Sequence, residues 1–306
     1  MTSTVPDPRR PFGRLLTAMV TPLRADGSLD ADGAAALATH LVDGQGNDGL
    51  VISGTTGESP TTTDAEKDTL LRAVIDAVGD RAYVIAGVGT NDTRHTIELA
   101  RAAEKAGAHG ALVVTPYYNK PPQEGLYAHF TAVADATGLP VMLYDIPHRA
   151  GVAIATETLC RLAEHVRIVA VKDAKAAPVE TAWVTRRTDL AIYSGDDPLT
   201  LPTLAIGGVG LVGTSTHLIG ARTKQMIEVY ESGDVAAALH LHHQLLPLFT
   251  GIFRTQGVIL VKAALGLLGL PAGPVRLPLV DATEAELAQL RTDCALSGLE
   301  LPEPVR

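Results

Sequence analysis

The chain has 306 residues, of which 46% are hydrophobic and 19% are charged, and its formal net charge is −9. This composition is typical of a soluble globular protein with a sizeable core. The negative charge argues against broad binding to nucleic acid or to an anionic membrane, although a few Arg or Lys residues inside a cleft can still bind an anionic small molecule. No run of about 18 uninterrupted apolar residues offers a membrane span.

The two cysteines, Cys160 and Cys294, show no metal-ligand spacing. A disulfide framework is therefore not expected, and a cytosolic protein is the natural interpretation. The first residues, MTSTVPDPRRPFGR, contain no apolar run of signal-peptide length. We expect residues 1–13 to form a short flexible lead.

Short apolar runs rich in Val, Ile and Leu recur along the chain, and most of them lack a clean alternation of apolar and polar residues. Such runs are typical of parallel strands that are buried on both faces. Each run ends in Gly, Pro, Thr, Ser or a charged residue. The runs cover residues 15–22, 49–58, 82–89, 110–118, 140–147, 168–174, 190–197 and 208–215.

Amphipathic, Ala-rich segments separate these runs and carry helix-boundary signals. Asp30 is a candidate N-cap, Thr63 or Asp64 is another, and Gly107 follows the end of a third segment. Eight strands alternating with helices predict an α/β fold, a (β/α)8 barrel of the TIM type. An open doubly wound sheet is the alternative, but GVGTND lacks the third glycine and the later acidic residue of a dinucleotide fingerprint.

The strand pattern stops after about residue 232, and the remaining apolar segments are helical in character. We therefore predict a barrel domain over residues 14–233, followed by a C-terminal helical domain over residues 234–306 that packs on the barrel. Gly233 marks the boundary between the two.

Chemistry in TIM barrels takes place at the C-terminal ends of the strands. The predicted strand ends carry hydroxyls, phenols, one guanidinium and one amine, but no histidine cluster, so a zinc site is poorly supported. These residues are Thr55, Thr56 and Glu58 on the second strand, Tyr117 and Tyr118 on the fourth, Tyr144, Asp145 and Arg149 on the fifth, Lys172 and Asp173 on the sixth, and Ser194, Asp196 and Asp197 on the seventh.

Several of these residues also have ordinary structural interpretations. The tyrosines at 117–118 could simply pack on the barrel, the threonines at 55–56 could form a turn, and the aspartates at 196–197 are typical of a helix cap. Sequence alone leaves these alternatives open.

Lys172 is harder to explain as a structural residue, because it ends the buried run IVAVKDA. Asp173 is not its obvious partner, since neighbours on a strand point to opposite faces. Burial with few counter-charges lowers the pKa of an amine, and a neutral amine attacks carbonyls, so a Schiff-base role is a candidate beside a structural one. Lys175 falls in the following loop and is expected to be solvated.

Five motifs in chain order resemble those of the dihydrodipicolinate synthase and N-acetylneuraminate lyase family, in the form that its actinobacterial synthases show. They are GTTGES at 54–59, TPYYNKP at 115–121, LYDIPHRAG at 143–151, VAVKDAKA at 169–176 and YSGDD at 193–197. The resemblance covers nearly the whole chain. It implies a lyase that condenses pyruvate with L-aspartate 4-semialdehyde, the first committed step of diaminopimelate and lysine biosynthesis.

The resemblance also implies roles for particular residues. Lys172 matches the lysine that forms a Schiff base with pyruvate, and Tyr144 matches the tyrosine that transfers protons. Thr55 matches a hydroxyl that relays protons between Tyr144 and Tyr118, and Tyr118 matches a residue that reaches into the active site of a neighbouring subunit.

Four further positions match the substrate-binding residues of the family. Thr56 lies where the pyruvate carboxylate binds, and Arg149 lies where a guanidinium binds the semialdehyde carboxylate. Val212 lies where a main-chain carbonyl faces the bound keto acid, and Gly195 is the fourth substrate-binding position. No metal and no organic cofactor are implied, and the expected assembly is a homotetramer built as a dimer of dimers.

Two departures from the family pattern stand near this site. His148 precedes Arg149 where a small residue is common, so it could crowd the semialdehyde site or form a hydrogen bond at its edge. Asp145 follows the tyrosine where Asn is also common, which we expect to be neutral.

Other functions remain possible from sequence alone. A sialic acid or keto-deoxy-sugar acid aldolase of the same superfamily shares the lysine and the tyrosine, whereas Arg149 and Tyr118 favour the synthase. A non-catalytic barrel that binds keto acids would not need Lys172, Tyr144 and Thr55 together.

The resemblance finally implies a possible allosteric site for L-lysine. His95 falls where lysine-sensitive members carry a glutamate, and Lys67 adds a like charge, while Asp64 could partly replace the missing carboxylate. We therefore predict weak or absent inhibition by lysine. The positions of this possible site are Ser59, Asp64, Lys67, Asn91, His95 and Tyr117.

Overall fold

The computed structural model describes residues 9–302. Eight parallel strands follow each other in sequence order and close into a barrel, because β1 pairs with both β2 and β8. This confirms the (β/α)8 fold and rules out the open sheet, and every strand is shorter than its predicted run. The strands are β1 (Leu15–Ala18), β2 (Gly49–Ile52), β3 (Tyr83–Gly87), β4 (Gly110–Val114), β5 (Val141–Asp145), β6 (Ile168–Asp173), β7 (Ala191–Ser194) and β8 (Gly210–Gly213).

The helices begin and end largely at the expected signals. Asp30 caps the first helix by accepting a hydrogen bond from the Gly33 N–H, and Thr63, rather than Asp64, forms a capping box with Glu66. The helices are α1 (Ala31–Thr39), α2 (Asp64–Val78), α3 (Thr93–Ala106), α4 (Gln123–Asp135), α5 (Pro147–Ala150), α6 (Thr156–Leu162), α7 (Pro178–Arg187), α8 (Thr200–Ala205), α9 (Thr216–Glu231), α10 (Val235–Gly251), α11 (Gly257–Leu267) and α12 (Glu284–Leu296).

Two apolar layers hold the barrel. One layer fills its interior with inward side chains such as Val51 and Met142, and the other lies between the strands and the surrounding helices. Phe12 belongs to the interior layer: it is 1% exposed, and its N–H donates to the Tyr193 hydroxyl. Residues 1–8 of the predicted lead lie outside the described part of the chain. Phe12, near the end of that lead, packs inside the barrel just before β1.

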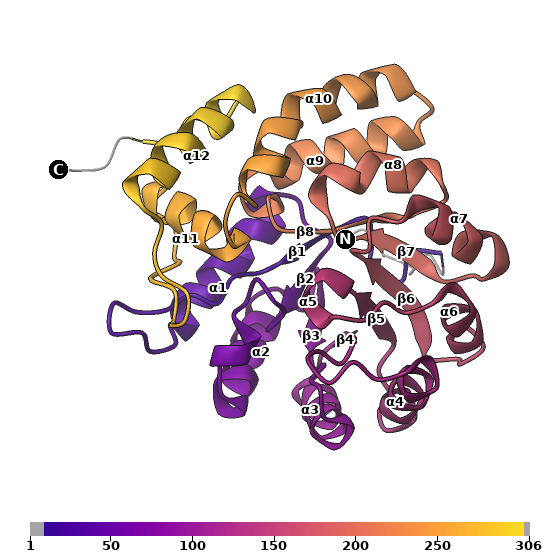
Figure 1. Cartoon of the computed structure of the whole chain (residues 1–306). Coiled ribbons are helices and arrows are strands. Elements are labelled where there is room, and N and C mark those ends of the chain that lie inside the picture. Colours follow the sequence, from indigo (N-terminus) through magenta and orange to yellow (C-terminus); the bar gives the residue numbers. More distant parts are fainter. Residues whose placement is uncertain (1–8, 303–306) are drawn as a thin grey trace.

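The helices after Gly233 cover one side of the barrel. α10 packs against α9 and α12, and α11 packs against the same two helices. Figure 1 shows these orange and yellow helices beside β1 and β8, whereas α2 to α7 surround the other strands. Between residues 9 and 302, no helix combines the length and apolar character needed to cross a membrane.

Candidate active site

Lys172 and Tyr144 lie side by side inside the barrel. β5 and β6 are neighbours, and their register places Tyr144 directly opposite Lys172. The lysine Nζ lies 4.4 Å from the centre of the tyrosine ring, and both residues are buried. Asp173 points to the other face, where its carboxylate accepts hydrogen bonds from the Lys175 N–H and the Thr181 hydroxyl. The predicted separation of Lys172 from Asp173 is thus confirmed.

The environment of Lys172 makes its amine easier to deprotonate. Burial lowers the pKa of Lys172 to about 8, the Asp197 carboxylate opposes this shift, and the Arg149 guanidinium adds to it. A substantial share of the amine is therefore neutral near pH 8, and the neutral form is the nucleophile.

Asp197 is a buried carboxylate that joins the ends of two strands. It is 0% exposed and accepts hydrogen bonds from the Thr214 and Ser215 N–H groups that follow β8, at 3.1 and 2.9 Å. The helix-cap interpretation of the pair at 196–197 is wrong, because neither carboxylate caps the short helix that follows. Sequence analysis missed this role, since the partners of Asp197 lie on another strand.

The threonine turn after β2 faces Tyr144. Thr55 and Tyr144 line the same cavity; burial raises the pKa of Tyr144 to about 12, and the Thr55 side chain opposes this rise. Thr56 is 9% exposed, and its hydroxyl lies 3.3 Å from that of Thr214. A protonated phenol with a hydroxyl partner can donate and receive a proton in turn.

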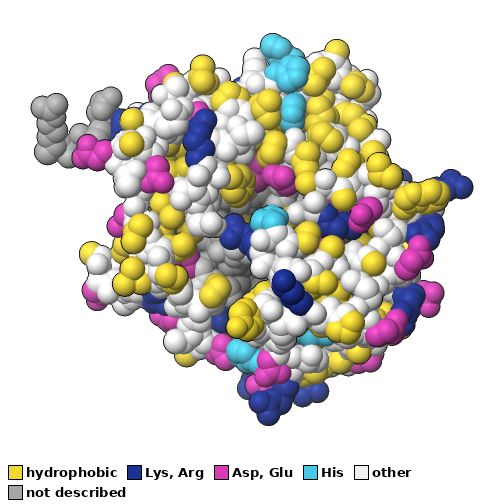
Figure 2. All heavy atoms as spheres, in the orientation of Figure 1, with side chains coloured by type: hydrophobic (Ala, Val, Ile, Leu, Met, Phe, Trp, Pro, Cys, Tyr) yellow, Lys and Arg dark blue, Asp and Glu magenta, His cyan; other side chains and the backbone are white. Residues whose placement is uncertain are grey.

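A cavity of about 230 Å³ opens at these strand ends. Arg149 on α5 lines it together with Thr55 and Tyr144. Figure 2 shows the surface hollowed near the centre of the view, with Lys or Arg and His side chains at its edge. The other predicted residues that line this cavity are Ser59 and Tyr117.

Gly195 follows the last residue of β7 and lies beside the Lys172 side chain. A Cβ added to Gly195 would lie 3.0 Å from the Lys172 Cγ, so the missing side chain leaves space for the lysine. Val212 is in β8 and is 1% exposed.

Tyr118 is not brought to the other predicted catalytic residues within this chain. Its side chain is 90% exposed, and its backbone has a left-handed φ of 74°. A left-handed non-glycine residue is strained, and such residues cluster at functional sites.

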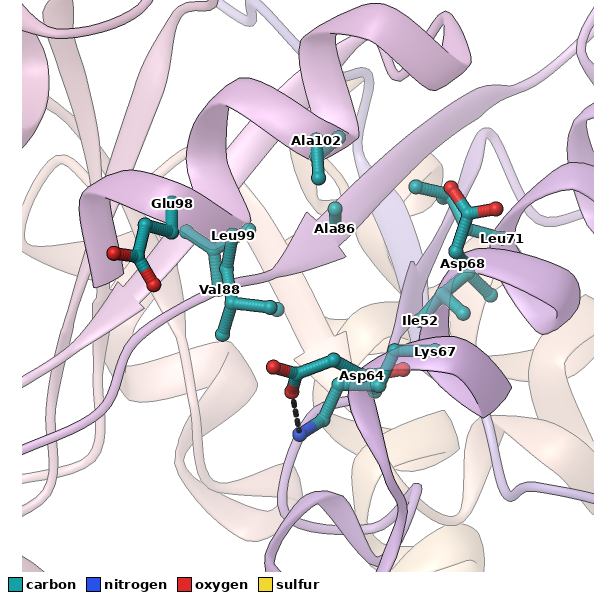
Figure 3. Close-up of a pocket in the computed structure, with 13 residues that line it drawn as sticks. Ile52, Asp64, Lys67, Asp68, Leu71, Ala86, Val88, Glu98, Leu99 and Ala102 are labelled. Carbon is teal, nitrogen blue, oxygen red and sulfur yellow. Dashed lines mark ion pairs between the residues drawn. The ribbon is translucent and has the colours of Figure 1, made fainter. Parts of the chain in front are cut away.

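A second cavity of about 240 Å³ lies between α2 and α3. Figure 3 shows Asp64 and Lys67 close together at one end of it, with Glu98 on the facing helix. The Asp64 carboxylate is 2.8 Å from His95 Nε2 and 3.5 Å from Lys67 Nζ, and the hydrogen bond from His95 is the main cause that lowers the pKa of Asp64. Ser53 and Gly87 line both cavities, so the two share a wall.

The possible allosteric residues therefore fall into separate groups. Asp64 contacts both Lys67 and His95, whereas Ser59 and Tyr117 line the first cavity. The Asn91 side chain is not among the residues lining either cavity, and its carbonyl accepts a hydrogen bond from the neighbouring loop.

Lys175 and Asp145 form a buried ion pair on the outer face of the barrel, at the ends of β5 and β6. Lys175 was expected to be solvated, and this is wrong: its side chain is 3% exposed and lies 3.5 Å from both Asp145 and Glu180. Burial raises the pKa of Asp145 to about 7, and the Lys175 charge opposes that shift. His148 on α5 is largely exposed, and the partial desolvation of its ring is the main cause that lowers its pKa, followed by the Arg149 charge.

Comparisons with known proteins agree with this architecture. The model of the Dihydrodipicolinate synthetase family matches residues 11–295. A 4-hydroxy-tetrahydrodipicolinate synthase of Acidothermus cellulolyticus is 73% identical over 94% of this chain and 93% of that protein. A second protein of that name, from Streptomyces coelicolor, is 64% identical over 96% of this chain and 98% of its own.

The solved structures give the same result. The structure described as DHDPS from Cyanidioschyzon merolae with lysine bound has a TM-score of 0.92 and 45% identity, over 94% of this chain and 99% of that one. The chain therefore belongs to the dihydrodipicolinate synthetase family.

Proposed function

We propose that this chain is a 4-hydroxy-tetrahydrodipicolinate synthase that condenses pyruvate with L-aspartate 4-semialdehyde. The assignment to a lyase of this family rests on relatives that carry this name at 73% and 64% identity. The observation that carries the chemistry is the buried amine of Lys172, which has a lowered pKa and lies against Tyr144.

The first half of the reaction makes pyruvate a nucleophile. The neutral Lys172 amine adds to the keto carbon, and water leaves to give an iminium. The iminium withdraws electrons, so a methyl proton is lost to the Tyr144 and Thr55 hydroxyls and an enamine forms.

The second half forms the new carbon–carbon bond. The enamine carbon attacks the aldehyde of the semialdehyde, and the resulting alkoxide takes a proton from the same hydroxyl relay. The amine of the semialdehyde then attacks the iminium carbon, which closes the ring and releases Lys172. Arg149 is assigned to the semialdehyde carboxylate, because its planar guanidinium suits a planar anion, and Thr56 to the pyruvate carboxylate.

The direct test is a condensation assay with purified protein, pyruvate and aspartate semialdehyde, coupled to the reductase that consumes the product. Turnover supports the proposal. Absence of turnover together with cleavage of a sialic acid or keto-deoxy-sugar acid would assign the protein to another branch of the superfamily.

We also propose a homotetramer in the cytosol. Tyr118 is 90% exposed on one side of the barrel mouth, as a residue that completes a neighbour's site would be. On α7, Val179 and Trp183 are 72% and 52% exposed and line a shallow apolar depression with Pro178 and Ile206. Two separate apolar or aromatic faces support two kinds of subunit contact, which a dimer of dimers requires.

Replacing Tyr118 with phenylalanine is expected to lower kcat more than it raises the pyruvate KM, because the change removes a proton relay rather than a carboxylate contact. Steady-state kinetics measure both constants. Analytical ultracentrifugation of the wild type at assay concentration is the companion experiment, and a fully active monomer would contradict the shared site.

Inhibition by L-lysine is expected to be weak or absent. The Asp64 carboxylate is already bonded to His95 and paired with Lys67, so it is a poor replacement for a free glutamate. The loss of one charge-assisted hydrogen bond costs about 1.5–3 kcal/mol, or at least about tenfold in affinity. Initial rates are measured against L-lysine at subsaturating pyruvate. Half-inhibition below the millimolar range would show that lysine binds through other contacts, and His95→Glu is expected to increase sensitivity.

A further inference from the structure

Glu58 is a buried carboxylate next to the threonine turn, and the mechanism does not use it. It follows the Thr55–Thr56–Gly57 segment, is 3% exposed and has a left-handed φ of 55°. Its Oε1 accepts a hydrogen bond from Lys262 Nζ at 2.6 Å, and its Oε2 accepts one from the Arg276 N–H at 2.8 Å. Both partners lie in the C-terminal part of the chain.

Lys262 is the only charged residue of the otherwise apolar helix α11, whose sequence is GVILVKAALGL. It is 4% exposed, and its amine also donates to the Pro274 carbonyl at 2.7 Å. A buried pair of charges costs more in desolvation than an apolar pair of similar shape. Packing alone therefore gives no reason to place an ion pair here.

The chain after α11 is fixed against the loops that follow β1 and β2. The Arg276 guanidinium donates to the Gly27 and Thr61 carbonyls and pairs with Glu66 on α2. The Leu23 N–H donates to the Ala272 carbonyl at 3.0 Å. The 272–276 segment thus contacts the loop after β1, the loop after β2 and the start of α2.

On the side away from the Glu58 carboxylate, the turn contacts the barrel. The Thr21 hydroxyl donates to the Gly57 carbonyl at 2.6 Å, and the Thr56 hydroxyl lies 3.3 Å from that of Thr214. The turn is therefore held between the barrel on one side and the C-terminal segment on the other.

We propose that the Lys262–Glu58 ion pair positions the Thr55–Thr56 turn for pyruvate, so that the C-terminal helices set the geometry of the substrate carboxylate site from outside. This inference rests on the proposed function, in which Thr56 binds the carboxylate and Thr55 contacts Tyr144. Lys262 and Glu58 are positioning residues, since their charged atoms bond to each other and to the 274–276 segment rather than to the residues assigned to the substrate.

The test uses Lys262→Met and Glu58→Gln in the full-length protein. Lys224→Met is the control, because Lys224 forms a similar 2.6 Å contact with Asp48 at the opposite end of the barrel. Pyruvate KM and kcat are measured well below the melting temperature of each variant. We expect Lys262→Met to raise the pyruvate KM about tenfold or more with a smaller change in kcat, and Lys224→Met to leave both unchanged.

The double variant Glu58→Gln with Lys262→Met is expected to recover part of the KM change, because no buried carboxylate is then left without its cation. A folded Lys262→Met protein with the pyruvate KM of the wild type overturns the inference. If Lys262→Met does not fold, the same criterion applies to Glu58→Gln. The two proposals stay distinct: a wild type without condensation activity rejects the proposed function, whereas an active wild type with a normal Lys262→Met KM rejects only the positioning role.

Discussion

Replacing Lys172 with arginine is expected to lower kcat by about a thousandfold or more, because a guanidinium stays protonated and cannot attack the keto carbon of pyruvate. With the wild type, borohydride reduction in the presence of pyruvate is expected to add one pyruvate-derived mass to the peptide that contains Lys172. Mass spectrometry of the digested protein measures the modification.

Lys175 provides the matched control, since it lies three residues later and points to the outer face of the barrel. Lys175→Arg is expected to leave the label on Lys172. A label on Lys175 in the wild type would show that the reactive amine has been assigned to the wrong side of β6.

The pH dependence of the trapping reaction follows from the pKa of Lys172, which is about 8. Below this value the neutral fraction rises about tenfold per pH unit, and above it the amine is mostly neutral. The initial rate of imine formation is therefore expected to increase with pH and to level off above about 8. A rate that keeps rising towards pH 10 would indicate an exposed, ordinary lysine.

The second large effect is expected for Tyr144→Phe, which removes the phenol hydroxyl beside Lys172 while keeping the ring. A positioned proton-transfer group contributes about 10²–10⁴-fold, and we expect kcat to fall by this factor. Loss of deuterium from methyl-labelled pyruvate, followed by NMR, measures the proton-transfer step separately from the condensation, and it is expected to slow as well.

Tyr193→Phe is the control for that variant, because Tyr193 is a second buried tyrosine of the barrel interior. Its hydroxyl bonds to the Phe12 N–H and the Gly13 carbonyl. These residues precede β1, at the end of the barrel opposite the threonine turn. Removing it is expected to lower the stability by about 1 kcal/mol without a change in kcat. Equal losses of kcat in both variants would assign the effect to packing.

The eight strands were predictable because parallel strands buried on both faces leave continuous apolar runs in the sequence. The strand ends then followed from the runs, so Lys172 and Tyr144 could be assigned to the barrel mouth before their register was known. That they are direct neighbours is a property of the closed sheet, in which β5 pairs with β6.

The errors concern contacts that depend on distant parts of the chain. Lys175 is in a loop, and a loop position does not reveal that the segment folds back over Asp145. The bonds of Asp197 cross to the next strand, and the partner of Glu58 is 204 residues away. The pattern of residues around a position in the sequence does not indicate contacts with such distant partners. The pairing of His95 with Asp64 was likewise invisible, although each residue had been singled out.

The direct pairing of Tyr144 with Lys172 across two parallel strands has a consequence for hydrogen exchange. Both residues lie within paired strands of the closed barrel, and neither is in a loop that can open alone. Amides in such strands exchange with solvent only when the whole fold opens, whereas loops exchange through local fluctuations. The backbone at the reactive lysine and tyrosine is therefore expected to be among the most protected of the protein, while the Tyr118 loop exchanges early. Heat is then expected to abolish imine formation in the same cooperative transition that unfolds the barrel.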